Sequence, residues 1–393
     1  MENNIENMIN KSNQNKKTIC FATMCKNEEH CIRDTLESVY KYIDYWVVHD
    51  TGSTDNTIQL VKDFFAEKNI PGELFEGEWV GFDHNKTQLF DRCYNKTDYI
   101  LHLDADDIFH GIPDFSLLNK ETADAYYFNC YRGVFYNVLL IFNNRHHWKF
   151  CGVAHTTIRD LDKENYSESR VFISESFYLL SRDTGSRSND PEKYYKDALR
   201  LKDQFFNTLF DDPDNLNNRS VFYTAQSYMD SNKLEDAIKW YNLYLKLKNT
   251  WTEEQFESCI RIAKCLIRIN PDDSFLIKKY IDMAINIFND RCEPYYIYGQ
   301  YCNQRHKWKE GYEYLVKTVN NDNYLDVKKK YHLFVEKSKY FPFNLDELSV
   351  SCYYLNKKDE GIDYINKIIN CPEIANSKDR IIKNKHFLEG IQV

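Results

Sequence analysis

The sequence lacks a run of apolar residues long enough to cross a membrane. The longest apolar stretch, residues 125–142, is interrupted by Asn129, Arg132 and Asn137, whereas a spanning helix needs about 18 or more apolar residues in succession. Residues 1–17 are rich in Asn, Lys and Glu and have no apolar segment of the kind found in secretory signals. We therefore expect no membrane span, a disordered tail over residues 1–17 and a cytoplasmic location.

Basic residues are too few for a nucleic-acid-binding protein. The chain has 51 Lys and Arg against 60 Asp and Glu, which gives a net charge of −9, and it has no extended basic run. Proteins that bind nucleic acid carry a basic face, so we expect no nucleic-acid partner. A polyanionic ligand would have to be held by a local cluster of residues, and a nucleoside diphosphate bound through a metal ion meets that condition.

Glycine and proline are scarce, and the cysteines form no metal-binding or redox motif. With 12 Gly and 8 Pro a collagen-like chain is excluded. None of the 12 cysteines forms a Cys-x-x-Cys pair, and no Cys/His group has zinc-finger spacing. We expect reduced thiols that fill core space.

Aromatic residues, in contrast, are abundant. The chain of 393 residues contains 30 Tyr, 25 Phe and 6 Trp, or 16% aromatics. This length suggests two or three domains, and aromatic side chains bury large areas. The composition therefore predicts more than one hydrophobic core.

The first half of the chain alternates between short apolar runs and amphipathic stretches, a pattern typical of a parallel α/β sheet. The apolar runs cover residues 18–24, 45–49, 73–75 and 99–103, and the helical patterns cover 30–43, 54–68 and 84–94. A strand-rich segment at 124–173 predicts an antiparallel or mixed extension of the same sheet. We expect an N-terminal domain over residues 18–190.

After the Ser- and Gly-containing loop at 183–191 the pattern becomes entirely helical. Expected helices cover 192–210, 218–231, 234–248, 252–269, 275–289, 294–304, 308–320, 326–338, 346–356 and 359–370. Small residues recur in the second helix of successive pairs, at Ala237, Ala284, Gly311 and Gly361. The intervals are irregular, but their mean of about 41 is near the period of helical repeats. Residues 191–393 are therefore expected to form a tetratricopeptide-like domain; the alternative is an unrelated helical bundle.

Three carboxylates follow the strand at 99–103. Asp104, Asp106 and Asp107 lie within four positions, and clustered carboxylates repel one another unless a cation is present. Mg²⁺ and Mn²⁺ prefer oxygen ligands and bind between carboxylates and substrate phosphates. The pattern predicts a metal and phosphate site; the alternative is a solvated turn that caps a helix.

Polar residues also follow the strands at 18–24 and 45–49. Thr23 to Glu29 follow the first of these strands, and the second ends in Asp50, before a Gly-containing turn. Ligands of open α/β sheets bind beyond the carboxyl ends of the strands. Asp50 and Asp104 are therefore expected to face one crevice, although capping of the next helix by Ser53 or Thr54 explains part of the turn.

These segments together resemble family 2 glycosyltransferases of the GT-A fold, which has a Rossmann-like mixed sheet. The resemblance rests on ATMCKNEE, VVHDTGSTDNT, GFDHNKT and LHLDADD in this order, and it covers roughly residues 18–190. Residues 177–198 resemble a stretch of members that carry a C-terminal tetratricopeptide-like region. The resemblance implies metal-dependent transfer of a sugar from a nucleotide-sugar donor, a UDP- or GDP-sugar, with inversion and with Mn²⁺ or Mg²⁺ as cofactor.

The resemblance also implies roles for individual residues around the donor. Thr23 and Asp50 would line the nucleotide pocket, with Glu28 nearby, and Thr51 stands where the family often has a second carboxylate. Lys86, at the position of a usual Arg, would contact the nucleotide or the diphosphate.

Further implied roles concern the metal and the phosphates. Asp104 would face the ribose and the metal, and Asp106 would bind the metal. Arg182 and Arg187, in the polar loop, would close over the phosphates, because guanidinium matches phosphate geometry.

The general base that inversion requires is the least defined group. His155 matches the His of a family segment whose following Glu is Thr156 here. His155 is a candidate metal ligand, donor contact or catalytic residue, or else an ordinary buried His. Asp160 is the second catalytic candidate, although its surroundings are typical of a solvated turn.

Two other functional classes compete with the transferase. One is an interaction scaffold with a decayed transferase domain, which Thr51 and Thr156 favour and the intact Asp104 and Asp106 oppose. The other is a nucleotidyltransferase, which would need a Gly-rich basic loop that residues 22–29 lack. As partners we expect a nucleotide-sugar donor and a glycan or protein acceptor, with the helical domain docking the acceptor or forming a homodimer.

Overall fold

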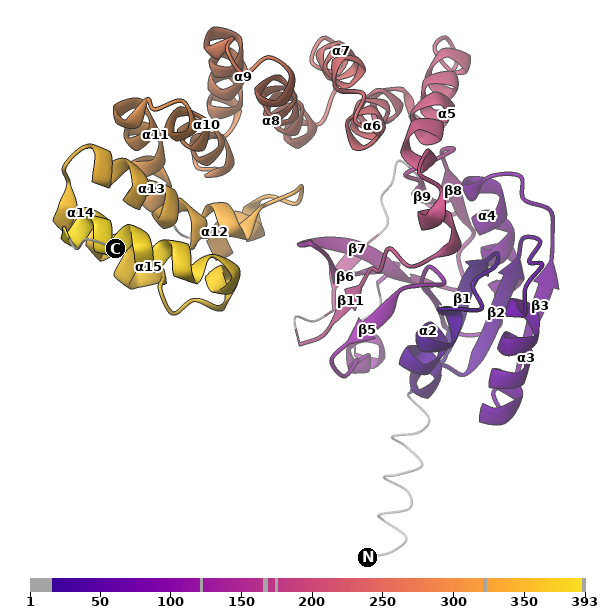
Figure 1. The fold of residues 1–393 in the computed structure, drawn as a ribbon. Coiled ribbons are helices and arrows are strands. Elements are labelled where there is room, and N and C mark those ends of the chain that lie inside the picture. The colour runs from indigo at the N-terminus through magenta and orange to yellow at the C-terminus, as the bar shows by residue number, and fades with distance from the viewer. Residues whose placement is uncertain (1–15, 121–122, 165–168, 174–175, 321–323, 391–393) are drawn as a thin grey trace, which may run out of the picture. The chain divides into compact units, whose positions relative to one another are not determined.

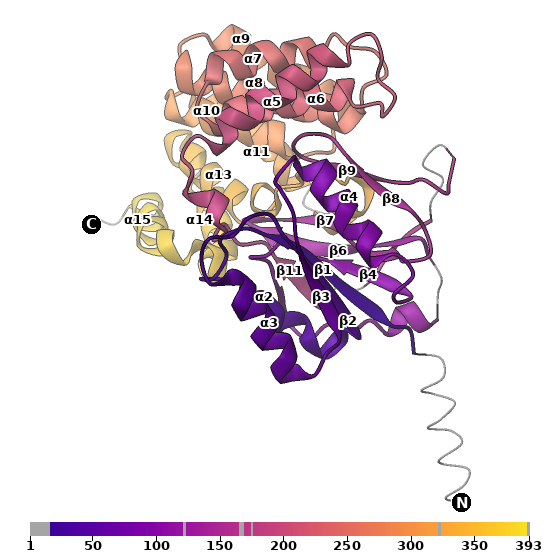
Figure 2. The same ribbon diagram turned by 90° about the vertical axis from the view of Figure 1, so that its right-hand side faces the viewer.

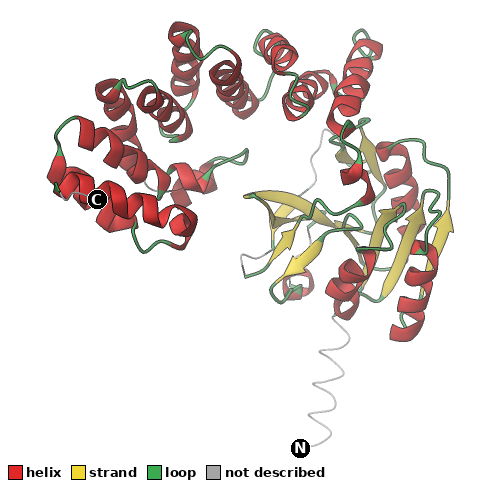
Figure 3. Ribbon diagram, viewed as in Figure 1, coloured by secondary structure: helices red, strands yellow, loops and turns green. Residues whose placement is uncertain are grey.

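The computed structural model describes residues 16–120, 123–164, 169–173, 176–320 and 324–390. The tail expected over residues 1–17 lies almost wholly outside this range. The chain forms two compact units, residues 1–220 and 221–393. Figure 3 shows that the strands belong to the first unit and that the second is helical, so the expected α/β domain followed by an all-α domain is confirmed.

The first unit is built on a nine-stranded mixed sheet (Figure 1). Its strands are β1 (Ile19–Cys25), β2 (Tyr45–Asp50), β3 (Gly72–Glu76), β4 (Tyr99–His102), β5 (Ile108–His110), β6 (Ala125–Arg132), β7 (Val134–Asn143), β10 (Arg170–Phe172) and β11 (Tyr178–Leu180). The order is β3-β2-β1-β4-β7-β6-β11-β5, and β10 pairs with β6. Strands β1 to β4 are parallel, while β7 is antiparallel to both β4 and β6.

Helices cover both faces of the parallel part of the sheet. They are α2 (Ile32–Val39), α3 (Thr57–Lys68) and α4 (Phe82–Cys93). Alternate residues of a strand point to opposite faces: Phe21 packs in the core with α2 and α3, whereas Ala22 packs in the core with α4. Figure 2 shows α2 and α3 on one side of the sheet and α4 on the other. Burial on both faces explains the continuous apolar runs of these strands.

The strand register brings the expected site residues to one edge of the sheet. Cys25, the last residue of β1, pairs with Asp50, the last residue of β2. Ala22 of β1 pairs with His102, the last residue of β4. The loops that carry Glu28 and Asp104 therefore start from neighbouring carboxyl ends, where ligands of such sheets bind.

A separate hairpin, β8 (Trp148–Cys151) and β9 (Thr157–Asp160), packs beside α4. The first unit continues beyond it through α5 (Lys193–Asn207).

The compact unit is longer than the domain predicted to end at residue 190. The side chain of Gln204 accepts a hydrogen bond from Val153 N at 2.8 Å. Lys149 Nζ lies 2.9 Å from a carboxylate oxygen of Asp214. These contacts attach α5 and the loop after it to the hairpin. The boundary between the two compact units therefore lies after residue 220, later than the position that the composition of the loop at 183–191 indicated.

The second unit consists mainly of consecutive helices. They are α6 (Asn217–Asp230), which starts in the first unit, α7 (Leu234–Tyr244), α8 (Thr252–Ile269), α9 (Ser274–Ile287), α10 (Glu293–Gln304), α11 (Trp308–Asn320), α12 (Tyr324–Lys330), α13 (Phe343–Tyr354), α14 (Lys358–Ile368) and α15 (Lys378–Glu389). Helices α8 and α9, α10 and α11, and α13 and α14 pack as successive pairs.

The small residues at the repeat positions allow the close helix contacts that the sequence predicts. Ala237 and Ala284 are fully buried. A Cβ atom on Gly311 would lie 2.6 Å from Asn303 Oδ1, and one on Gly361 would lie 3.0 Å from Leu388 side-chain carbons. A larger side chain at either glycine would therefore push the helices apart.

One expected helix is wrong in extent, and one helix was not foreseen. The helix expected over 326–338 ends at Lys330, because the backbone N–H groups of His332 and Leu333 donate to Glu253 Oε2, at 2.9 and 2.6 Å, instead of continuing the helix. Helix α15 follows the last helix that the sequence pattern indicated.

All 12 cysteines are free thiols, and 11 of them are buried, which agrees with their predicted role as core residues. Among the residues that the structure describes, no helix is both long and apolar enough to cross a membrane.

Candidate active site

Asp104 follows β4 and faces solvent beside Lys86 of α4. The Asp104 side chain is 62% exposed and that of Lys86 is 12% exposed. Lys86 Nζ lies 2.9 Å from Asp104 Oδ1 and 5.8 Å from the centre of the Phe150 ring. The Lys86 charge lowers the pKa of Asp104 to about 2. Asp104 is therefore an ionised carboxylate whose oxygens are accessible at neutral pH.

Asp106 is held by the segment that follows β11. The backbone N–H groups of Thr184 and Gly185 donate to Asp106 Oδ2 at 3.1 and 2.8 Å. Burial raises the pKa of Asp106, and the nearby Asp104 raises it further. Burial likewise raises the pKa of Asp107, with added repulsion from both neighbouring carboxylates. The three carboxylates thus raise one another's pKa or are affected by one another's charge, a repulsion that a divalent cation would relieve.

Asp50 and Thr23, the expected nucleotide-pocket residues, are both fully buried. Gly52 N and Ser53 N donate to Asp50 Oδ1 at 3.0 and 2.8 Å. The Thr23 hydroxyl has no hydrogen-bond partner among the described residues. Asp50 therefore shapes the turn after β2. The backbone of that turn, more than the two side chains, is what faces solvent here.

The loops after β1 and β2 are joined by hydrogen bonds. Thr54 N donates to Asn27 Oδ1 at 2.7 Å, and Glu28 N donates to Thr57 Oγ1 at 2.8 Å. Thr51 Oγ1 donates to the backbone oxygen of the last β1 residue at 3.2 Å. Thr51, at the position where the resemblance implies a second carboxylate, is therefore a neutral residue bonded to the sheet.

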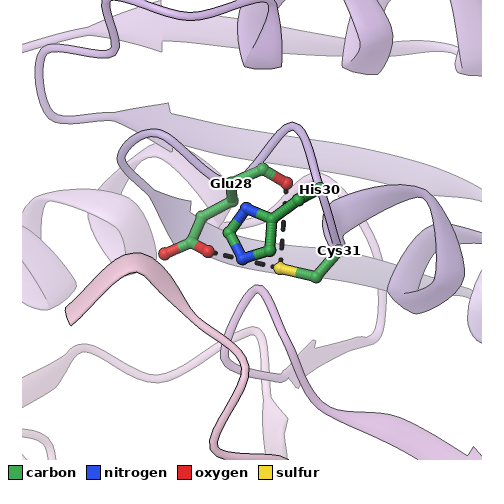
Figure 4. A group of neighbouring side chains, drawn as sticks. All are labelled: Glu28, His30 and Cys31. Atoms are coloured by element: carbon green, nitrogen blue, oxygen red, sulfur yellow. Dashed lines mark hydrogen bonds between the residues drawn. The ribbon is translucent and has the colours of Figure 1, made fainter. Parts of the chain in front are cut away.

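Glu28, His30 and Cys31 form a cluster before α2 (Figure 4). Both carboxylate oxygens of Glu28 lie 3.1 Å from Ser186 N, and Cys31 Sγ donates to Oε2 at 3.2 Å. His30 Nε2 lies 2.6 Å from Thr184 O. Burial raises the pKa of Glu28. In this structure Glu28 contacts the segment after β11, although it was expected near the nucleotide.

The two arginines of that segment are engaged in ion pairs. Arg182 Nη1 lies 2.9 Å from Asp34 Oδ2, so this guanidinium fastens the segment to α2. Arg187 pairs with the buried Asp197, and its guanidinium carbon lies 5.0 Å from the centre of the Phe82 ring. The Arg187 side chain is 45% exposed, so one side of it is open to a ligand.

His155 lies in the turn between β8 and β9 and has a left-handed backbone, with φ of 48°. Arg219 fixes this turn through two hydrogen bonds to His155 O, at 3.0 and 2.9 Å. The Phe150 ring of β8 lies 5.8 Å from the His102 ring as well as from Lys86 Nζ. The end of the hairpin that carries His155 is therefore on the same side of the sheet edge as Asp104.

Asp160 is neither a solvated turn residue nor part of this edge. Its side chain is fully buried, and Asp160 Oδ2 lies 2.5 Å from His146 Nδ1. Asp124 Oδ1 lies 3.6 Å from the same nitrogen. His146 follows β7, whose Asn143 pairs with Tyr99, the first residue of β4. Asp160 thus lies at the opposite end of β4 from Asp104, which corrects the expected position.

Two features of the site were missed. One is the set of backbone N–H groups at 184–186, which donate hydrogen bonds to Asp106 and Glu28. The only feature of the sequence that pointed to them was Gly185 within a polar loop. The other is His102, the last residue of β4, two positions before Asp104. His102 Nδ1 lies 3.0 Å from Ala22 O, and burial lowers its pKa to about 4, so it is neutral.

The chain is similar to one family model and to several solved structures. Residues 20–176 match the family model described as glycosyl transferase family 2. The crystal structure of S. aureus TarS 1-349 in complex with UDP-GlcNAc is 14% identical, covers 70% of this chain and 90% of that chain, and gives a TM-score of 0.33. MamA 41-end from Desulfovibrio magneticus RS-1 is 12% identical, covers 50% of this chain and 98% of that chain, and gives a TM-score of 0.32. No curated protein matches the chain.

Proposed function

We propose a specific reaction for the segment of residues 20–176, which matches the glycosyl transferase family 2 model. The chain transfers a sugar, with inversion, from a UDP- or GDP-sugar to a glycan or protein acceptor, with Mn²⁺ or Mg²⁺ bound at Asp104 and Asp106. The observation that carries the proposal is the exposed, ionised Asp104 beside Asp106 at the carboxyl edge of the sheet.

The residues at this edge fit a hard divalent cation. Both carboxylates supply oxygen ligands, which Mg²⁺ and Mn²⁺ prefer. The loop contacts of Asp106 end on Oδ2, so we assign Oδ1 to the cation. When bound, the metal neutralises the charge that develops on the leaving nucleoside diphosphate.

Lys86 and Arg187 provide positive charge for the donor. Lys86 Nζ, which lies 2.9 Å from Asp104 Oδ1, would also contact the diphosphate of the donor. Arg187 keeps its stacked position on Phe82 and offers its open side to a phosphate, for which guanidinium geometry is suited. Both charges act on the leaving group, where stabilisation of developing charge has the largest effect.

His155 is the group that we assign to the acceptor side of the donor. It lies in the turn at the Lys86 end of the hairpin, and Arg219 fixes its backbone. An imidazole there is suited to accept a proton from an acceptor hydroxyl or to complete the metal site. We do not assign this role to Asp160, because it pairs with His146 at the other end of β4.

A panel of nucleotide sugars, screened for hydrolysis and for transfer, tests the proposal. We expect one donor class to be hydrolysed only with Mn²⁺ or Mg²⁺, and we expect Asp106→Ala to abolish the reaction. Asp63→Ala, on the exposed surface of α3, is the matched control and should retain full activity. A folded wild-type protein that binds no nucleotide sugar would overturn the proposal in favour of a scaffold with a decayed transferase domain.

The helical unit carries the remaining part of the proposal. It docks the acceptor, and self-association through its helices is the alternative assignment. Light scattering of the full chain distinguishes acceptor docking from self-association. A monomer leaves the helices available for an acceptor, whereas a dimer favours binding of a second copy of the chain.

A further inference from the structure

The segment that follows β11 is bound between two carboxylates from different parts of the sheet edge. On one side Thr184 N and Gly185 N donate to Asp106 Oδ2. On the other side Ser186 N lies 3.1 Å from both carboxylate oxygens of Glu28. Three successive backbone N–H groups thus point at carboxylates.

Gly185 lies directly between the two acids. A Cβ atom on Gly185 would be 3.2 Å from Asp106 Oδ2 and 3.5 Å from Glu28 Oε1. The segment therefore has almost no freedom to move toward either carboxylate. If Glu28 releases Ser186, the adjacent Gly185 N–H loses its fixed direction toward Asp106.

Other contacts of the Glu28 loop reinforce the same placement. The Ser186 hydroxyl donates to Asn27 O, and His30 Nε2 lies 2.6 Å from Thr184 O. Figure 4 shows the Glu28 carboxylate pointing away from the loop backbone, with one of its oxygens joined to Cys31 Sγ by a dashed line. Glu28 is 9% exposed, and its bond to Ser186 N is partly buried.

We propose that Glu28 is a positioning residue that holds Ser186 so that Thr184 and Gly185 orient the Asp106 carboxylate for the cation. This inference rests on the proposed function of Asp106. Groups that orient a metal ligand change metal affinity without touching the metal, and their loss typically weakens binding about 10- to 100-fold.

The proline substitution of Ser186 removes the N–H group with little change in backbone shape. Gly185 has φ of −61° and ψ of 154°, which is the extended conformation that a residue before proline adopts. Ser186 is the first residue of a 3₁₀ turn, Ser186–Asn189, where proline is tolerated. Ser186→Ala is the matched control, because it removes the hydroxyl bond to Asn27 O but keeps the N–H bond to Glu28 on which the proposal rests.

Calorimetric Mn²⁺ titrations in the presence of UDP test the proposal with the full chain. We expect Glu28→Ala and Ser186→Pro each to weaken Mn²⁺ binding about tenfold or more, while Ser186→Ala changes it about twofold or less. Because both substitutions break one contact, the double variant should bind Mn²⁺ no more weakly than the worse single variant. Unchanged affinity in Glu28→Ala, or additive losses in the double variant, would overturn the proposal.

Amide hydrogen exchange of the metal-free protein gives a readout that does not depend on catalysis. Glu28→Ala should speed exchange in residues 182–189 and leave helix α7 (234–244) unchanged. Unchanged exchange in 182–189 would show that Glu28 does not hold the segment. A wild-type protein that binds no Mn²⁺ would overturn the proposed function and the positioning role together, while the exchange result would still report whether the contact forms.

Discussion

The two units both gather carboxylates, but they surround them differently. In the helical unit the acids lie inside the helix array, with less than 10% of each exposed: Glu253, Glu254, Glu257 and Glu293. In the α/β unit Asp104 is 62% exposed at the sheet edge, and the side chain nearest to it is a lysine. A carboxylate that is enclosed by fixed partners serves the fold, whereas one that is open on a side is available to a ligand.

The titration behaviour of the two sets follows from the same difference. Burial raises the pKa of Glu257 to about 7, even though Arg261 and Arg291 act in the opposite direction. At Asp104 the charge of Lys86 has the largest effect and lowers the pKa to about 2. Desolvation has the largest effect on the pKa of Glu257 among the helices, and charge pairing has the largest effect on the pKa of Asp104 at the open edge.

The largest expected effect comes from breaking an enclosed pair. Arg291 is fully buried, and it binds Glu293 in a bidentate manner, with N–O distances of 2.9 and 3.0 Å. Arg291→Met leaves Glu293 as an uncompensated buried charge, so we expect the free energy of unfolding to fall by about 3–5 kcal/mol. Urea denaturation followed by circular dichroism measures this loss. A change below about 1 kcal/mol would mean that the enclosed acids are not structural.

A substitution of a carboxylate at the open sheet edge should lower the activity and not the stability. Asp106→Asn keeps an oxygen that accepts hydrogen bonds from Thr184 and Gly185, but it removes the negative charge. We expect the transfer rate to fall about 100-fold or more, while the thermal midpoint stays close to that of the wild type. A large loss of stability with little loss of activity would place Asp106 with the structural acids.

Asp160 tests whether the comparison also holds within the α/β unit. Its side chain is fully buried against His146, so it belongs with the enclosed carboxylates. We expect Asp160→Asn to reduce the free energy of unfolding by about 1–3 kcal/mol and to leave the activity per folded molecule unchanged. Loss of activity in the folded variant, measured alongside thermal denaturation, would restore Asp160 as a catalytic candidate.

The smallest expected effect is a titration shift at Asp104. Lys86→Met removes the charge that lowers the Asp104 pKa, so that pKa should rise from about 2 toward its ordinary value of 3.8. Because the folded-state pKa is the lower one, this pair stabilises the fold above the unfolded-state pKa and loses its effect as the pH falls through the folded-state value. Carbon-13 NMR of the side-chain carboxyl measures the shift. An unchanged pKa would show that Lys86 does not pair with Asp104 in solution.

Much of the fold follows from local sequence patterns. The apolar run at 99–103 contains β4, and the helix expected over 308–320 coincides with α11. Both elements are determined by periodicity within a few turns of chain. The prediction of a helix over 326–338 was wrong at its C-terminal end, because two backbone N–H groups there donate to the side chain of Glu253. Glu253 is far away in the sequence, and a local pattern cannot indicate such a contact.

The site divides in the same way. Asp104 and Asp106 could be predicted, because carboxylates directly after a buried strand are a local signal. The contact between Glu28 and Ser186 spans 158 positions, and the pair of His146 and Asp160 depends on how a hairpin folds back on the sheet. In both cases tertiary contact decides the role of a carboxylate, and the surrounding sequence does not encode it.

Calorimetric titration of the wild-type protein with UDP and with GDP, with and without Mn²⁺, tests the central claim most directly. We predict that one of the two nucleotides binds only when Mn²⁺ is present. We also predict that Asp104→Asn abolishes this Mn²⁺-dependent binding. Nucleotide binding of equal strength without metal would contradict the assignment of the open carboxylates to a cation.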